Sequence, residues 1–127
     1  MKKVLYLLAL TLFVSCSGNS VLNSVTKEIG DPAATKQFGK NETHYTWEKV
    51  SLKNKDILKN ALDKAIGILP TKKVEFEPQA DETGNTISGA YTTYYVWETS
   101  QAVTELDCNY RMSDSNNMEV VLTVTKK

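Results

Sequence analysis

The stretch YVWETS, Tyr95–Ser100, repeats a phrase that the chain has already used as YTWEKV, Tyr45–Val50. Both stretches contain the frame Tyr-x-Trp-Glu, and together they hold the only two tryptophans of the protein. Alternate residues of a strand point to opposite faces, so Tyr and Trp share one face and Glu takes the other. Burying an unpaired carboxylate is costly, whereas burying Tyr or Trp is favourable. We therefore expect Trp47 and Trp97 to face the core.

The sequence around the two phrases is also repeated. NSVTKEIG at 23–30 aligns with NALDKAIG at 60–67, and a proline follows each segment, at Pro32 and Pro70. The order helix, Gly, Pro, strand and Tyr-x-Trp-Glu therefore occurs twice. This order predicts two diverged helix-plus-hairpin units, of which the second is enlarged.

Two helices are expected from apolar residues at helical spacing. The first covers 21–29 and ends at Gly30. The second begins after Asn54, which we expect to cap it, and ends at Pro70. Its apolar stripe consists of Ile57, Leu58, Ala61, Leu62, Ala65 and Leu69.

The rest of the chain alternates with a period of two, which indicates strands. We expect strands at 35–38, 43–51, 88–98, 103–112 and 118–125. A further strand after Pro70 would direct Val74 and Phe76 toward the core. Such alternation is typical of an antiparallel sheet with one covered face. The predicted fold class is α+β, with two helices packed on one face of an antiparallel sheet.

The N-terminal segment has the pattern of a secretory signal peptide: Lys2 and Lys3 precede an apolar run from Val4 to Val14. That run is too short to span a bilayer, which takes about 20 apolar residues. Its end, FVSCSGN, resembles the lipobox of bacterial lipoproteins, with Phe13 where that family usually has Leu. The resemblance implies cleavage before Cys16 and lipid attachment to this cysteine. The alternative is an ordinary signal peptide that is cleaved near Ser17 or Gly18 and removes Cys16.

The expected domain organisation is a signal peptide at 1–15, a tether at 16–20 and one α+β domain at 21–127. The lipobox resemblance implies a lipid-anchored protein of the cell envelope. In enteric lipoproteins an aspartate after the cysteine resembles a signal for retention in the inner membrane, and this chain has Ser17 there. The resemblance therefore implies the periplasmic side of the outer membrane. Without Lys2 and Lys3 the mature chain has 13 basic and 15 acidic residues, a net charge of −2. This charge argues against nucleic acid as a partner.

Cysteine usage agrees with this assignment. Cys16 and Cys108 are the only cysteines, so a lipidated Cys16 leaves Cys108 without an intramolecular partner. Cys108 alternates with Leu106 and Tyr110 and should be a buried core thiol. We expect a monomer without disulfides.

A short helix that ends in Gly-x-Pro, followed by a hairpin with an aromatic second strand, resembles the SmpA/OmlA-type outer-membrane assembly lipoproteins and the β-lactamase-inhibitor-protein fold. The residues that carry the resemblance are Gly30, Pro32, Tyr45 and Trp47, and in the second unit Gly67, Pro70, Tyr95 and Trp97. The second unit departs from the pattern by inserting Ile68 and Leu69 before its proline. The resemblance implies a binding role.

Catalytic signals are lacking in the sequence. His44 is the only histidine, no Ser or Cys lies in a Gly-x-Ser-x-Gly elbow, and no Cys/His cluster suits zinc. We expect no enzymatic activity, no cofactor and no metal. The expected function is a small protein-binding or assembly module of the cell envelope with an unknown envelope protein as partner. The alternative is an inhibitor or immunity protein that blocks an enzyme with its sheet face. If the aromatic face were exposed, the partner-binding residues would be Tyr45, Trp47, Tyr91, Tyr95 and Trp97.

Overall fold

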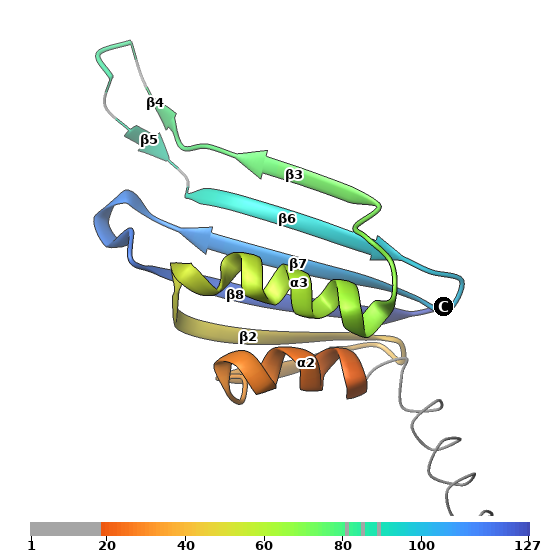
Figure 1. Cartoon of the computed structure of the whole chain (residues 1–127). Coiled ribbons are helices and arrows are strands. Elements are labelled where there is room, and N and C mark those ends of the chain that lie inside the picture. The colour runs from red at the N-terminus through yellow and green to blue at the C-terminus, as the bar shows by residue number, and fades with distance from the viewer. Residues whose placement is uncertain (1–18, 81, 85, 89) are drawn as a thin grey trace, which may run out of the picture.

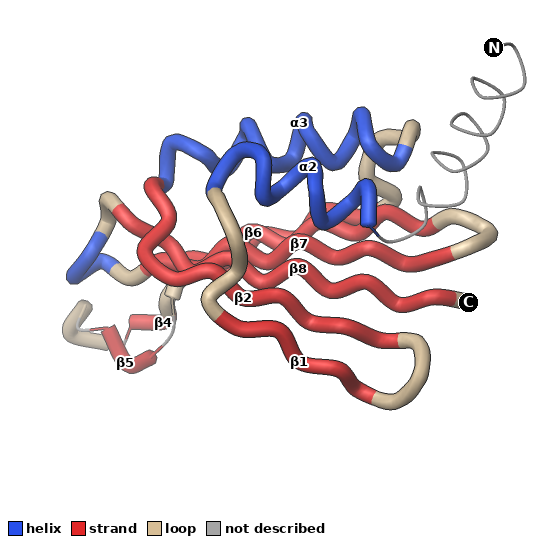
Figure 2. Tube along the Cα trace, turned by 90° about the horizontal axis from the view of Figure 1, so that it is seen from below, coloured by secondary structure: helices blue, strands red, loops and turns tan. Residues whose placement is uncertain are grey.

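The computed structural model describes residues 19–80, 82–84, 86–88 and 90–127 (Figure 1). Two helices pack on one face of a six-stranded antiparallel sheet, as the view along the sheet shows (Figure 2). The predicted α+β class and the placement of the helices are thus confirmed. Cys16 and the predicted signal peptide lie outside the described residues. Within the described ranges, no helix is long and apolar enough to cross a membrane.

Both helices end in the same way. Helix α2 spans Asn19–Ile29 and α3 spans Lys55–Ile66. The glycine after each one, Gly30 or Gly67, has a positive φ of 84° or 88°. Each of these glycines donates its N–H to the carbonyl four residues earlier, at 2.8 Å. Glycine suits this left-handed position because it has no Cβ. Helix α2 begins two residues before its predicted start.

Two predictions for α3 are wrong. The helix stops at Ile66 because Gly67 takes the left-handed conformation, so Pro70 does not end it, and Leu69 is 70% exposed. Asn54 makes no side-chain capping bond. It is the last residue of a 3-10 turn, η1 (Leu52–Asn54), and already has helical backbone angles. Of the predicted stripe, Leu58 and Leu62 are fully buried.

The strand order explains the repeated phrase. The sheet consists of β1 (Ala34–Phe38), β2 (Glu42–Ser51), β3 (Lys72–Phe76), β6 (Tyr91–Glu98), β7 (Ala102–Tyr110) and β8 (Asn117–Lys126). Their order is β1-β2-β8-β7-β6-β3, and every neighbouring pair is antiparallel. The two phrases lie on β2 and β6, each second from an edge, while β7 and β8 form the centre. In each unit an edge strand therefore follows the helix, and the Trp-bearing strand comes next inward.

Each tryptophan is tied to its own helix. Trp47 is 3% exposed and donates its indole N–H to the carbonyl of Gly30 at 2.9 Å, at the end of α2. Trp97 is fully buried and donates to Oδ1 of Asp63 in α3, also at 2.9 Å. The prediction that both tryptophans face the core is confirmed.

The expected direction of Val74 and Phe76 is wrong. Lys73 pairs with Tyr95 and Glu75 pairs with Thr93, so these polar residues of β3 share the helix-covered face. Val74 and Phe76 lie on the other face, and Phe76 is 57% exposed. The register of β3 against β6 sets this orientation, since a shift of one residue would exchange the two sets. The Lys73 ammonium lies 5.7 Å from the centroid of the Tyr95 ring.

Cys108 is a free thiol that is 1% exposed, as the alternation predicted. Burial raises its pKa to about 12, and the nearby Lys55 ammonium offsets part of this rise. Only the thiolate reacts rapidly with disulfide reagents. We expect the native protein to react with an aromatic disulfide reagent orders of magnitude more slowly than after unfolding in denaturant. Fast labelling of the native thiol at pH 8 would contradict this burial.

Candidate functional site

The five aromatic residues singled out in the sequence lie on the helix-covered face. Trp47, Tyr95 and Trp97 are buried beneath the helices. Tyr45 is half-buried and packs against the core, while Tyr91 is half-buried and stacks on the ring of Tyr110. While the helices stay packed on the sheet, these residues do not form an exposed aromatic surface.

The alternate residues of the same strands point to the opposite surface of the sheet. We call this surface the open face because no described helix or strand packs on it (Figure 2). The register assigns the members: Leu106 pairs with Tyr95 and Leu122 on the covered side, so the alternate positions face outward. The centre of the open face consists of Tyr94, Val96, Glu105, Asp107, Val121 and Thr123. In the sequence, these residues could be recognised only as the positions that alternate with the Tyr and Trp residues.

The centre of the open face is acidic. The Tyr94 hydroxyl donates a hydrogen bond to Glu105, and burial together with this bond raises the pKa of Tyr94. Burial also raises the pKa of Asp107, and the carboxylates of Glu105 and Glu119 raise it further. The like charges are therefore close enough to repel one another. Outside the bulge of β2, the open-face positions of β2, β6, β7 and β8, all described, carry no Lys or Arg.

A second polar group lies toward the β1 side of the open face. Nε2 of His44 lies 2.8 Å from the Glu42 carboxylate, and the His44 ring packs against Phe38 with centroids 4.3 Å apart. Phe38 at this edge and Phe76 at the opposite edge are both exposed. The open face is thus an acidic centre between two edge strands, each of which carries an exposed aromatic ring and a lysine, Lys36 or Lys72.

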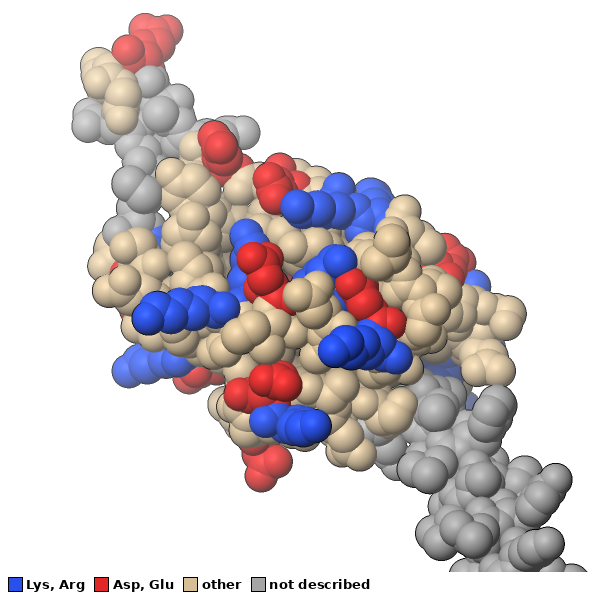
Figure 3. Space-filling view, in the orientation of Figure 1, with Lys and Arg blue, Asp and Glu red and all other residues tan. Residues whose placement is uncertain are grey.

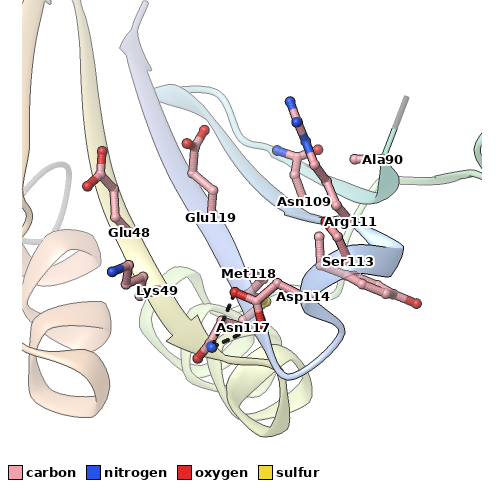
Figure 4. Close-up of a pocket in the computed structure, with 11 residues that line it drawn as sticks. Glu48, Lys49, Ala90, Asn109, Arg111, Ser113, Asp114, Asn117, Met118 and Glu119 are labelled. Atoms are coloured by element: carbon pink, nitrogen blue, oxygen red, sulfur yellow. Dashed lines mark hydrogen bonds between the residues drawn. The ribbon is translucent and has the colours of Figure 1, made fainter. Parts of the chain in front are cut away.

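A cavity of about 450 Å³ opens at one end of this face (Figure 4). Glu48 and Glu119 extend in the same direction from neighbouring strands, and Asn109 and Arg111 line the side toward β7. The floor includes the turn between β7 and β8, where Asn117 donates to Asp114 at 3.2 Å. We call this cavity, at the end of the sheet that carries the β7–β8 turn, the distal cavity.

Backbone strain marks the same place. Lys49 has a φ of 55°, the one positive φ of a residue other than glycine among the described residues. It belongs to a bulge in which Glu48 and Lys49 face one residue of β8, between the pairs Trp47–Val120 and Val50–Met118. Strained residues and bulges occur at binding sites, where they redirect side chains. Here the bulge brings Glu48 and Lys49 to the rim of the distal cavity.

The helix-covered side has a different charge pattern. Lys and Arg residues alternate with Asp and Glu over this side, without a large area of one sign (Figure 3). The described residues include no group of three or more His, Cys, Asp or Glu side chains that could hold a metal ion.

No protein-family model, curated protein or solved structure matches the chain.

Proposed function

We propose that this chain is a lipid-anchored binding protein of the cell envelope, on the periplasmic side of the outer membrane, whose open face binds the basic surface of a partner protein. The observation that carries the proposal is the acidic centre of a sheet face that no described element covers. Burial raises the pKa of the Asp107 carboxyl group, and the neighbouring Glu105 and Glu119 raise it further. A Lys or Arg side chain of a partner beside Asp107 would offset the repulsion among these carboxylates.

The composition of the open face suits a protein partner. Phe38 and Phe76 are exposed at its two edges, and aromatic residues contribute strongly to protein interfaces. Tyr94 is held in place by its bond to Glu105 and so loses little conformational freedom on binding. The acidic charges would steer a basic partner and fix its orientation.

Crosslinking in living cells tests the proposal. A photoreactive amino acid is placed at Phe76 on the open face or, as a matched control, at Ile57 on α3. Both positions hold large exposed apolar side chains, 57% and 44% exposed. We expect one discrete adduct from position 76, formed with an envelope protein that presents a basic surface. An adduct that forms from position 57 alone would place the interface on the helices and contradict the proposal.

Charge neutralisation measures the contribution of the acidic centre. Binding to the purified partner should weaken at least about tenfold in the double variant Asp107→Asn and Glu119→Gln, because both carboxylates lose their attraction to the basic surface. A tenfold change corresponds to about 1.4 kcal/mol. Glu28→Gln combined with Asp31→Asn changes the same charges at exposed positions away from the open face and should leave the affinity unchanged. Equal effects of the two pairs would indicate a general charge effect and refute a specific site.

Inhibition of a partner enzyme is the second candidate. The breadth of the six-stranded open face favours it, because such a surface can cover the entrance to an active site. The crosslinked partner decides between the two functions. An enzyme whose activity falls on stoichiometric addition of this protein would support inhibition, and an assembly protein without such an effect would support the binding module.

A further inference from the structure

The end of the domain next to the predicted anchor gathers segments that are far apart in the sequence. Backbone bonds join Lys126 to Asn41 at 2.8 Å and Lys127 to Gln101 at 2.9 Å, so the C-terminus lies between the β1–β2 and β6–β7 turns. The N–H of Thr71 bonds to the carbonyl of Val96, which brings the segment after α3 to the same end. Figure 2 shows the start of α2 at this end as well. We call it the anchor end.

The anchor end carries both exposed apolar residues and exposed lysines. Leu69 is 70% exposed and Ile68 is 38% exposed, and both follow the left-handed Gly67 that ends α3. The exposed lysines of this end are Lys40, Lys72, Lys126 and Lys127. Lys127 pairs with Glu98 at 2.8 Å, which leaves the other three as the main source of positive charge. Exposed apolar side chains and lysines at one end of a domain are the composition of surfaces that bind the interface of an anionic membrane.

The length of the chain before α2 brings this surface to the bilayer. Helix α2 begins at Asn19, three residues after Cys16. Three residues span at most about 10 Å. This is close to the Debye length of about 8 Å at physiological ionic strength, so lysines near the start of α2 would feel the charge of the lipid headgroups.

We propose that the anchor end docks on the surface of the membrane that holds the lipid of Cys16, with Leu69 and Ile68 in the interface and Lys40, Lys72 and Lys126 on anionic headgroups. This inference rests on the proposed lipid anchor. Docking would direct the strands away from the bilayer. Glu119 at the distal cavity lies seven residues along β8 from Lys126, so it would stand about 23 Å farther out. A partner could then reach the cavity and the open face together.

The test uses the mature protein, purified from cells that express the full chain, together with vesicles of phosphatidylethanolamine and phosphatidylglycerol. An environment-sensitive dye is attached to Leu69→Cys or, as the control, to Ile57→Cys, near the opposite end of α3. Both positions are exposed, and the buried Cys108 does not compete for the reagent. We expect the dye at position 69, and not at 57, to shift to the blue and to be quenched by a headgroup-labelled lipid. Replacing Lys40, Lys72 and Lys126 with glutamine, or omitting phosphatidylglycerol, should reduce the shift.

The outcomes separate docking from anchoring. If the protein floats with the vesicles and the dye at position 69 stays as aqueous as the dye at 57, docking is wrong and the anchor stands. If the protein does not float with the vesicles, the anchor is wrong and docking falls with it. Equal blue shifts at the two positions would show that the helices lie flat on the membrane, which also overturns the proposed orientation.

Discussion

Replacing Trp97 with alanine is expected to lower the free energy of unfolding by about 3–5 kcal/mol, the range for removal of a large buried aromatic side chain. Trp97 is fully buried, and the substitution would leave a cavity between α3 and the sheet. Domains of this size are stable by about 5–15 kcal/mol in all, so a large part of the stability would be lost. Equilibrium denaturation in urea measures the change.

Replacing Trp47 with alanine should remove a similar packing free energy, but Trp97→Ala also deprives the Asp63 carboxylate of its indole donor. The sequence alone favours a larger effect at Trp97, because the helix predicted for its unit is longer and its strand is predicted to be central. The structure removes both reasons, because β2 and β6 are each second from an edge and the helices have 11 and 12 residues. A difference larger than the contribution of that hydrogen bond, about 1.5–3 kcal/mol, would contradict the equivalence of the two units.

Phenylalanine at the same positions should separate packing from hydrogen bonding. Trp97→Phe leaves the carboxylate of Asp63 without its indole donor in a setting that is only 15% exposed, although Lys59 still pairs with it at 2.6 Å. Trp47→Phe frees the carbonyl of Gly30, and this residue is exposed, so water can replace the indole. Bonds to charged groups contribute about 1.5–3 kcal/mol. We expect the Phe variant at 97 to be the less stable one.

Fluorescence checks the premise before any variant is made. Both indoles should emit at short wavelength and resist quenching by acrylamide in the folded protein, because both are buried. Ready quenching of both would contradict the packing of the helices on the sheet and would return the Tyr/Trp face to consideration as a binding surface.

Replacing Cys16 with alanine is expected to abolish lipid attachment and, with it, the association of the protein with the membrane. The reason is the lipobox-like FVSC after the apolar run. Metabolic labelling with a palmitate analogue measures attachment, and fractionation measures the loss from the membrane. An anchor of two or three acyl chains binds far more tightly than a single chain, since each buried methylene contributes about 0.8 kcal/mol.

Cys108→Ala is the matched control for this experiment. It removes the only other cysteine, and its label and membrane fraction should equal those of the unaltered protein. A small loss of stability is expected from the cavity left by the thiol. Label that persists in Cys16→Ala, or that disappears in Cys108→Ala, would show that the lipid is not attached to Cys16 and would refute the proposed anchor.

Much of the fold could be predicted because it depends on local patterns. The period of two from 103 to 112 and from 118 to 125 located β7 and β8 to within two residues at each end. The Tyr-x-Trp-Glu frame assigned Trp47 and Trp97 to the core, since only that choice kept the glutamates in water. Errors arose where two local signals competed. Gly67 ends α3 before Pro70 can, because a left-handed residue stops the helix wherever it occurs.

The candidate site was less accessible to such reasoning. Alternation shows which residues of one strand share a face, but it does not show which strand lies beside another. Glu105, Asp107 and Glu119 form one acidic surface only because β7 pairs with β8. The distal cavity likewise depends on the bulge at Lys49 in β2, which has no clear signature in the sequence.

The sequence by itself determined the α+β class, the two helices and the buried side of the Trp-bearing strands, because hydrophobic periodicity acts within each segment. Only the tertiary structure decided the strand order, the outward direction of Val74 and Phe76, and the grouping of Leu69 with Lys40 and Lys126 at the anchor end. These features join residues that are distant along the chain. They follow from the pairing register and from where each strand turns, and both are settled by packing across the whole domain.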